Sequence, residues 1–176
     1  INLDELRKAI TGCGLQVFFQ PQASVVDRSV FGAEALVRWK HPQHGMISPC
    51  DFLPLAEANG LVDMLTIVMM GKALAECSKW LKHGLQMRVS VNIAADSLAS
   101  TDFADVVADM AARHGVPPGM LMLEVTESAM LSNLSASLET MARLRLKGFH
   151  LAVDDFGTGF SSLQQLSQIP LSELKI

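Results

Sequence analysis

The chain has 176 residues, of which 49% are hydrophobic and 18% charged, and its formal net charge is −4. This composition predicts one folded domain with a substantial core and excludes a disordered chain. The acidic balance also argues against a broad surface for a nucleic acid polymer.

Strands and helices alternate along the chain, and this alternation predicts an α/β fold with a mostly parallel sheet. The strands are short apolar runs, and several helices end at a glycine. The first half of the chain predicts a short N-terminal helix, strands at 15–22 and 30–40 with a turn near Asp27, and helices at 48–60 and 63–83. The second half predicts strands at 87–94, 120–126 and 149–155, and these alternate with helices at 102–114 and at 132–147, the latter ended by Gly148. A short helix at 161–169 and the beginning of a strand at 172–176 follow.

The helix after the second strand carries a distinct start signal. Pro49 suits the first helical position, and Asp51 is expected to complete a capping box with Ser48. Gly60 predicts the end of the same helix.

Acidic and amide side chains stand at the polar ends of the strand-like runs. Because side chains alternate between the faces of a strand, Glu34, Asn92 and Glu124 should point into one interior, opposite an apolar face that packs on helices. Asn92 and Glu124 are 32 residues apart, and Asp154 follows 30 residues later, which is about one βα unit each time. Polar residues at the carboxyl ends of consecutive parallel strands are typical of the catalytic face of a (β/α)8 barrel.

A buried carboxylate is costly unless it is paired or binds a metal ion, so this cluster predicts a site for hard cations. Mg²⁺ and Mn²⁺ prefer oxygen ligands, and no comparable set of thiolates or imidazoles competes. Asp155 can share the site with its neighbour Asp154 only if the strand ends there, which the glycine-rich turn after it favours. The candidate ligands are Glu34, Asn92, Glu124, Asp154 and Asp155.

These residues lie in motifs that resemble a known family. GAEALVRW at 32–39 and DDFGTGFSSL at 154–163 are similar to the signature motifs of the EAL-domain family, the bacterial cyclic di-GMP phosphodiesterases. The similarity continues through FFQPQ, SVNIA, LEVTES and LSELKI and covers essentially the whole chain. It implies a TIM-like (β/α)8 barrel whose first strand is antiparallel to the rest.

The resemblance also implies an activity, which is hydrolysis of one phosphodiester bond of cyclic di-GMP to give linear pGpG. The cofactor is Mg²⁺ or Mn²⁺, and Ca²⁺ should inhibit because its larger radius and looser geometry misplace the reacting groups. Asp155 is expected beside the second metal ion and the attacking water, and Lys175 is expected to orient that water. The implied catalytic residues are Glu34, Asp155 and Lys175, and the implied metal ligands are the five named above.

Other implied roles concern substrate and assembly. Gln20, Leu36 and Arg38 are expected to line the nucleotide cleft, with Arg38 on a phosphate. Glu127 is expected to couple the loop after the paired aspartates to a dimer interface. The implied partners are cyclic di-GMP, a second copy of the chain in a homodimer, and a regulatory or sensor domain elsewhere in the full-length protein.

Cysteine usage bears on location. Three cysteines that are widely spaced and odd in number favour reduced thiols over a disulfide framework. The N-terminus lacks a signal-peptide layout, and the most apolar stretch, residues 61–77, is interrupted by charges. A cytoplasmic location is expected, either as a free protein or as the cytoplasmic part of a membrane-anchored one.

Two departures from the family pattern are mild, because Ala94 replaces a common serine and Phe160 a common tyrosine. A larger departure is at the C-terminal end, where family members continue past LKI with further strands that carry a glutamate and a glutamine. Residues 1–176 are therefore expected to be an EAL domain that is incomplete at its C-terminal end, with the barrel truncated after about five and a half strands.

Alternative functions remain open on the same fold. The domain could bind cyclic di-GMP as a receptor without cleaving it, or it could serve as a protein-interaction module. Because every ligand position available in this chain is retained, the phosphodiesterase is favoured.

Individual residues also have simpler interpretations. Asn92 could cap the turn after its strand, Glu127 could pair with Ser128 at a helix start, and Arg38 could pack on the surface. A metal site at His41 and His44 is not expected, because two histidines without further ligands rarely form one. On the long helix, the side chains expected to fill the hydrophobic core of the protein are Met64, Met69 and Met70.

Overall fold

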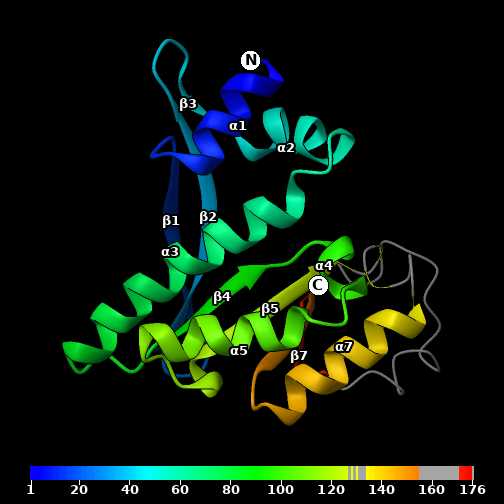
Figure 1. Cartoon of the computed structure of the whole chain (residues 1–176). Helices are drawn as coiled ribbons and strands as arrows, with labels where there is room; N and C mark the ends of the chain where they lie inside the picture. The colour runs from blue at the N-terminus through cyan, green and yellow to red at the C-terminus, as the bar shows by residue number, and fades with distance from the viewer. Residues whose placement is uncertain (127, 129, 131–133, 155–170, 176) are drawn as a thin grey trace.

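The structure is a computed structural model, and it describes residues 1–126, 128, 130, 134–154 and 171–175. Its strands are β1 Leu15–Ala23, β2 Val30–His41, β3 Gly45–Ile47, β4 Arg88–Asn92, β5 Leu121–Thr126, β6 His150–Asp154 and β7 Glu173–Leu174. They form one sheet in the order β1-β2-β4-β5-β6-β7, with β3 paired to β2 (Figure 1). β1 runs antiparallel to β2, whereas β2, β4, β5, β6 and β7 run parallel to one another, as expected for a barrel with a reversed first strand.

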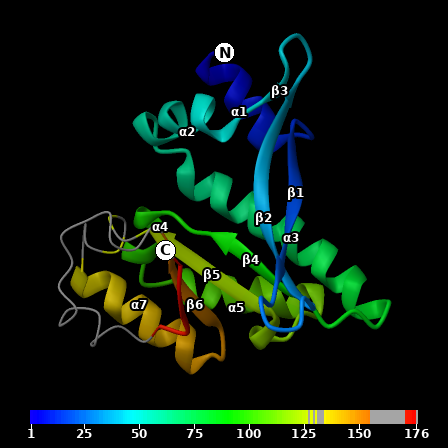
Figure 2. The ribbon, with the colours of Figure 1, turned by 180° about the vertical axis from the view of Figure 1, so that it is seen from behind.

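Helices cover one face of this sheet. The helices are α1 Leu3–Thr11, α2 Pro49–Ala58, α3 Val62–Lys82, α4 Ala95–Ala99, α5 Phe103–His114 and α7 Leu134–Leu146, with a 3-10 turn at Pro118–Met120. Figures 1 and 2 show α3, α5 and α7 on the same side of the parallel strands, so that the opposite, inner face is left for other contacts. No helix in the described ranges is long and apolar enough to cross a membrane.

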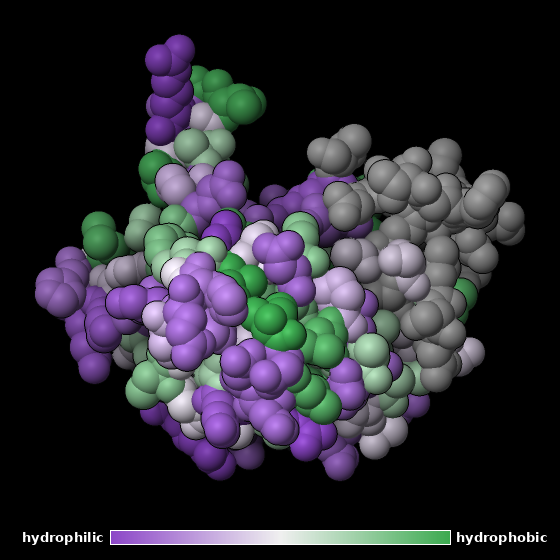
Figure 3. Space-filling model, turned by 90° about the horizontal axis from the view of Figure 1, so that it is seen from above, coloured by the Kyte–Doolittle hydropathy of each residue, from purple (hydrophilic) through white to green (hydrophobic). Residues whose placement is uncertain are grey.

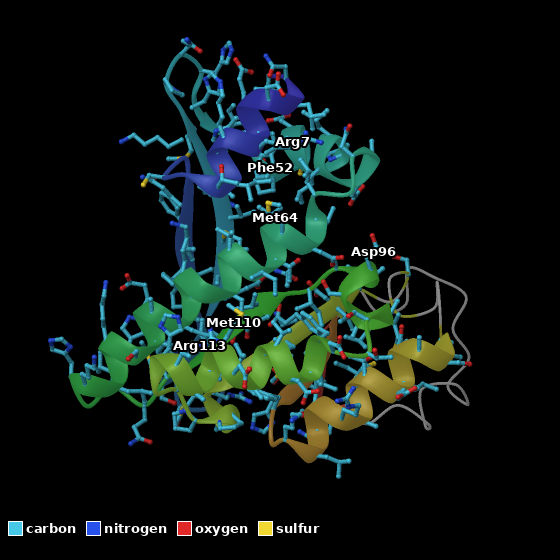
Figure 4. All side chains as sticks on the ribbon, viewed as in Figure 1. Arg7, Phe52, Met64, Asp96, Met110 and Arg113 are labelled. Atoms are coloured by element: carbon cyan, nitrogen blue, oxygen red, sulfur yellow. The ribbon has the colours of Figure 1, made fainter. Side chains whose placement is uncertain are left out.

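The main hydrophobic core lies between the parallel strands and these helices. Val89 and Val91 of β4, and Ile93 directly after it, project into this core, which confirms that this face of the strand packs on helices. On the helix side, Met110 of α5 lies close to α3 at Gly71, where an added Cβ would be 3.6 Å from the Met110 Cε, and Figure 4 shows Met110 between the two helices. The polar side chains of β4, which alternate with these apolar ones, are left to face the inner side.

A second core holds α1, α2 and β3 together above the main core (Figures 1 and 2). The fully buried Phe52 of α2 lies in this lobe, as Figure 4 shows, and meets the Trp39 ring edge-on at a centroid distance of 5.7 Å. Trp39 belongs to β2, which continues down into the main sheet. This strand therefore links the upper lobe to the barrel.

Some local predictions differ from the structure. Pro49 does occupy the first turn of α2, but the Ser48 side chain makes no capping hydrogen bond, so the predicted capping box is wrong. The Asp51 N–H instead donates to the Ser48 carbonyl oxygen at 3.0 Å. Met69 and Met70 are buried as predicted, whereas Met64 is 47% exposed in the first turn of α3.

Two short elements were not predicted. β3 has three residues directly after a short loop that contains Pro42, and α4 has five residues without a side-chain cap. Both are too short to show a hydrophobic period. The predicted helix at 161–169 lies outside the described residues.

Candidate active site

Four of the predicted site residues, Glu34, Asn92, Glu124 and Lys175, meet on the inner face of the sheet. Asn92 at the end of β4 and Glu124 in β5 are register partners, which places their side chains next to each other. The Asn92 Nδ2 donates to the Glu34 Oε1 at 3.0 Å, so β2 and β4 are joined at the same level. The carboxylate of Glu34 is thereby held in one orientation.

Lys175 lies between the two glutamates. Its Nζ is 2.5 Å from the Glu124 Oε1 and 3.4 Å from the Glu34 Oε2. The backbone N–H of Lys175 donates to the Val153 carbonyl at 2.8 Å, which fixes the residue immediately after β7. Side chains from β2, β5 and the end of β7 therefore form one charged cluster.

The charged cluster is fully buried at Glu124. Glu124 is 0% exposed, and burial raises the pKa of its carboxyl group, with the Lys175 ammonium acting in the opposite direction. For Lys175, burial tends to lower the pKa, but the hydrogen bond and charge of Glu124 and the charges of Glu34 and Asp154 outweigh it, so the pKa is raised. The lysine is therefore a permanent cation at neutral pH, and it stabilises the ionised form of Glu124.

Asp154 ends β6 and is half-buried, with Thr126 of β5 as its register partner. It is close enough to Lys175 for its charge to raise the lysine pKa. Asp155 and Glu127 lie outside the described residues. Within the ranges that are described, no three histidine, cysteine, aspartate or glutamate side chains gather in a geometry that would hold a metal ion.

The donor set nevertheless fits a hard cation. Apart from the ion pair between its Oε1 and Lys175, the buried carboxylate of Glu124 accepts no hydrogen bond of good geometry from the described residues, although buried polar atoms are normally hydrogen-bonded. Glu34 and Asn92 add further oxygens at the same level, and none of these residues offers a thiolate or an imidazole. Such a set matches the preference of Mg²⁺ and Mn²⁺.

The residues predicted to bind substrate are spread along the first two strands. Gln20 is exposed and is the register partner of Glu34. Leu36 is half-buried and lines a cavity of about 630 Å³. Arg38 donates from its Nη1 to the Val37 carbonyl oxygen at 2.8 Å, toward the upper end of β2.

This cavity was not predicted from the sequence. It lies beside Asn92, between β2, β4, α2, α3 and α4, and its lining is mostly apolar with Glu57, Thr66 and Asp96 among the polar members. Figure 4 shows Asp96 at the upper edge of the barrel. The molecular surface seen from above is mostly polar, with a group of apolar side chains near its centre (Figure 3). The available signal was that Asp96 follows Asn92 by four residues, just beyond the carboxyl end of a strand, where ligands bind in such folds.

Comparisons with known proteins agree on one family. The EAL domain model matches residues 3–176. MucR of Pseudomonas aeruginosa, a bifunctional diguanylate cyclase/cyclic di-GMP phosphodiesterase, is 39% identical over 175 residues, which are 99% of this chain and 26% of that protein. NbdA of the same organism, a cyclic di-GMP phosphodiesterase, is 38% identical over 174 residues, which are 98% of this chain and 22% of that protein. The chain thus spans about a quarter of the length of these curated relatives.

Solved structures give the same result. The PaMucR phosphodiesterase in its c-di-GMP complex aligns with a TM-score of 0.93 and 39% identity, over 98% of this chain and 70% of that one. The EAL enzyme Bd1971, bound to cAMP and cyclic di-GMP, aligns with a TM-score of 0.89 and 28% identity, over 98% of this chain and 48% of that one. These alignments also confirm the predicted fold class, a TIM-like barrel of which only part is present.

Proposed function

Because this chain belongs to the EAL-domain family, we propose that the whole protein is a metal-dependent phosphodiesterase that hydrolyses cyclic di-GMP to linear pGpG. The observation that carries the proposal is the cluster of Glu34, Asn92, Glu124 and Lys175 at the inner face of the parallel strands. The names of the relatives MucR and NbdA support the same activity. We further propose that residues 1–176 are a single EAL domain, incomplete at its C-terminal end.

Phosphodiesterases of this family generally depend on a metal ion, and we propose Mg²⁺ or Mn²⁺ here, with Ca²⁺ as an inhibitor. When bound, such a cation neutralises the phosphate charge and lowers the pKa of a bound water. The residues that would hold it are Glu34, Asn92, Glu124, Asp154 and Asp155. The fully buried carboxylate of Glu124, which has the ion pair with Lys175 but no hydrogen bond of good geometry from the described residues, supports this assignment for the described part of the set.

The remaining side chains have distinct tasks in this proposal. Lys175 stays protonated between two carboxylates and orients the attacking water through a hydrogen bond. Asn92 contributes an oxygen without adding charge, and its amide nitrogen holds Glu34 in place. Leu36 and the adjoining cavity would take part of the nucleotide, and Arg38 and Gln20 would contact substrate from β2 and β1.

We also propose further domains, a homodimer and a cytoplasmic location for the full-length protein. The greater length of the relatives supports additional domains, such as a sensor, in the full-length protein. A homodimer, with Glu127 coupling its interface to the site, follows only from the family resemblance. Three unpaired cysteines support a cytoplasmic setting.

The test is the Glu34→Ala variant of the full-length protein, assayed with cyclic di-GMP and Mn²⁺. Losing one anionic metal ligand should reduce the rate of pGpG formation by at least about 10²-fold. This is the rate loss that follows when an enzyme loses a main electrostatic contributor to transition-state stabilisation. Glu76→Gln is a matched control, because Glu76 pairs only with the neighbouring surface residue Lys79 among the described residues.

Near-normal turnover by Glu34→Ala would refute the role of this glutamate. A second measurement addresses the receptor alternative, namely equilibrium binding of cyclic di-GMP in Ca²⁺. An unaltered protein that binds the nucleotide in Ca²⁺ but forms no pGpG in Mn²⁺ would be a receptor and not an enzyme.

A further inference from the structure

The strand that leads to Lys175 is held by a short ladder. In β7, Glu173 and Leu174 pair only with Ala152 and Val153 of β6 within the described residues. A shift of one residue in a strand turns every side chain to the other face of the sheet. The register of this ladder therefore decides whether Lys175 points toward Glu124 or away from it.

The Glu173 side chain of β7 reaches across the inner face of the sheet to Arg88 of β4. Glu173 and Lys175 are two residues apart and so point to the same side. The Glu173 Oε2 lies 3.7 Å from the Arg88 Nη2 at the start of β4. Since β5 and β6 separate β4 from β7, this ion pair spans two intervening strands.

Arg88 is itself held in position. Its guanidinium carbon lies 5.3 Å from the centre of the Phe31 ring, at cation–π distance. The Arg88 and Glu173 side chains are only 30% and 37% exposed, so their pairing is less screened by water than a fully exposed pair. In a register shifted by one residue, Glu173 would point to the helix side and could not reach Arg88.

We propose that Arg88 is a positioning residue for the active site. By pairing with Glu173 it fixes the register of β7, and this register holds Lys175 between Glu34 and Glu124. The geometry stands without any assumption about activity. Only the predicted effect on turnover rests on the proposed function.

The test compares three variants of the full-length protein: Arg88→Met, Glu173→Gln, and the charge swap Arg88→Glu with Glu173→Arg. The first readout is hydrogen exchange of the Lys175 amide, which is bonded to Val153. We expect exchange to be about 1.5- to fivefold faster in the single variants, the range that a partly exposed ion pair supports, and near its original rate in the swap. Lys79→Met, which breaks a surface pair on α3, is the control and should leave this exchange unchanged.

The second readout separates positioning from substrate binding. In the single variants kcat for cyclic di-GMP should fall by a similar factor while KM stays the same, and the swap should recover kcat. Glu173→Gln keeps the test valid if Arg88→Met lowers overall stability. Unchanged exchange at Lys175 in a folded single variant, or no recovery in a folded swap, would overturn the inference. If the unaltered protein forms no pGpG, the proposed function fails, and the exchange measurement still tests the role of Arg88.

Discussion

Glu124 combines complete burial with a negative charge, and its neighbours determine how that charge is tolerated. Burial raises its pKa, and the Lys175 ammonium 2.5 Å away opposes this shift. Removing one partner of a buried ion pair costs about 3–5 kcal/mol, because the other charge is left without compensation. The pair is therefore part of the fold as well as of the proposed chemistry.

Cys77 shows the same effect of burial on a thiol. It is completely buried, and burial raises its pKa to about 11, whereas Cys13 and Cys50 are exposed. Because the thiolate is the reactive form, we predict that iodoacetamide at pH 8 modifies Cys77 on the order of 10²-fold more slowly than a free thiol. Peptide mapping by mass spectrometry would measure this rate.

The two exposed cysteines serve as internal controls for that measurement. In urea all three thiols should react alike, because unfolding removes the burial. Modification of Cys77 in the native protein at the rate of Cys13 would contradict the buried position.

At the scale of single elements, some helical glycines have room for a side chain, whereas others hold a backbone conformation that favours glycine. Gly71 lies in the middle of α3, and a Cβ added there would meet only the Met110 Cε, at an ordinary contact distance of 3.6 Å. Gly115 ends α5 with φ +65°, a backbone conformation that residues with a side chain rarely adopt. The same substitution should therefore have opposite effects at the two positions.

We predict that Gly71→Ala raises the free energy of unfolding by about 0.5–1 kcal/mol, because alanine reduces the chain entropy lost when the helix forms. Gly115→Ala should lower it by about 1 kcal/mol, because of the strain at positive φ. Urea unfolding followed by circular dichroism would measure both. A stability loss in Gly71→Ala would mean that α3 and α5 pack too tightly at this point to accept a methyl group.

At the scale of the whole molecule, the described part of the sheet has two open edges. Within the described residues β1 and β7 each pair on one side only, and Phe18 of β1 and Val30 of β2 are each about half-exposed. Unpaired edges and apolar surface favour association with another chain. Under the proposal that residues 1–176 are an incomplete EAL domain, further strands of the full-length protein would cover these edges.

We predict that residues 1–176, produced alone, are self-associated or poorly soluble and lack appreciable hydrolysis of cyclic di-GMP. Light scattering gives the mass, and an assay with Mn²⁺ gives the activity. The full-length protein is the control for both. A stable and active monomer would show that the further strands are dispensable for folding and catalysis.

The sequence by itself determined much of this protein. Alternation along each strand is a local property, so the residue pattern alone assigns Glu34, Asn92 and Glu124 to one interior. Glycine signals also located helix ends, since Gly60, Gly84 and Gly115 all have positive φ just after helices. The motifs identified the family and fold class, which the comparisons confirm.

Only the tertiary structure decided which distant side chains meet. The Arg88–Glu173 pair and the 2.5 Å bond from the Ser97 Oγ to Asp63 join elements that are far apart in the sequence. The cavity beside Asn92 likewise depends on how α2, α3 and α4 pack around two strands. Such contacts depend on strand register and on helix packing across the sheet, which the local period of a sequence does not contain.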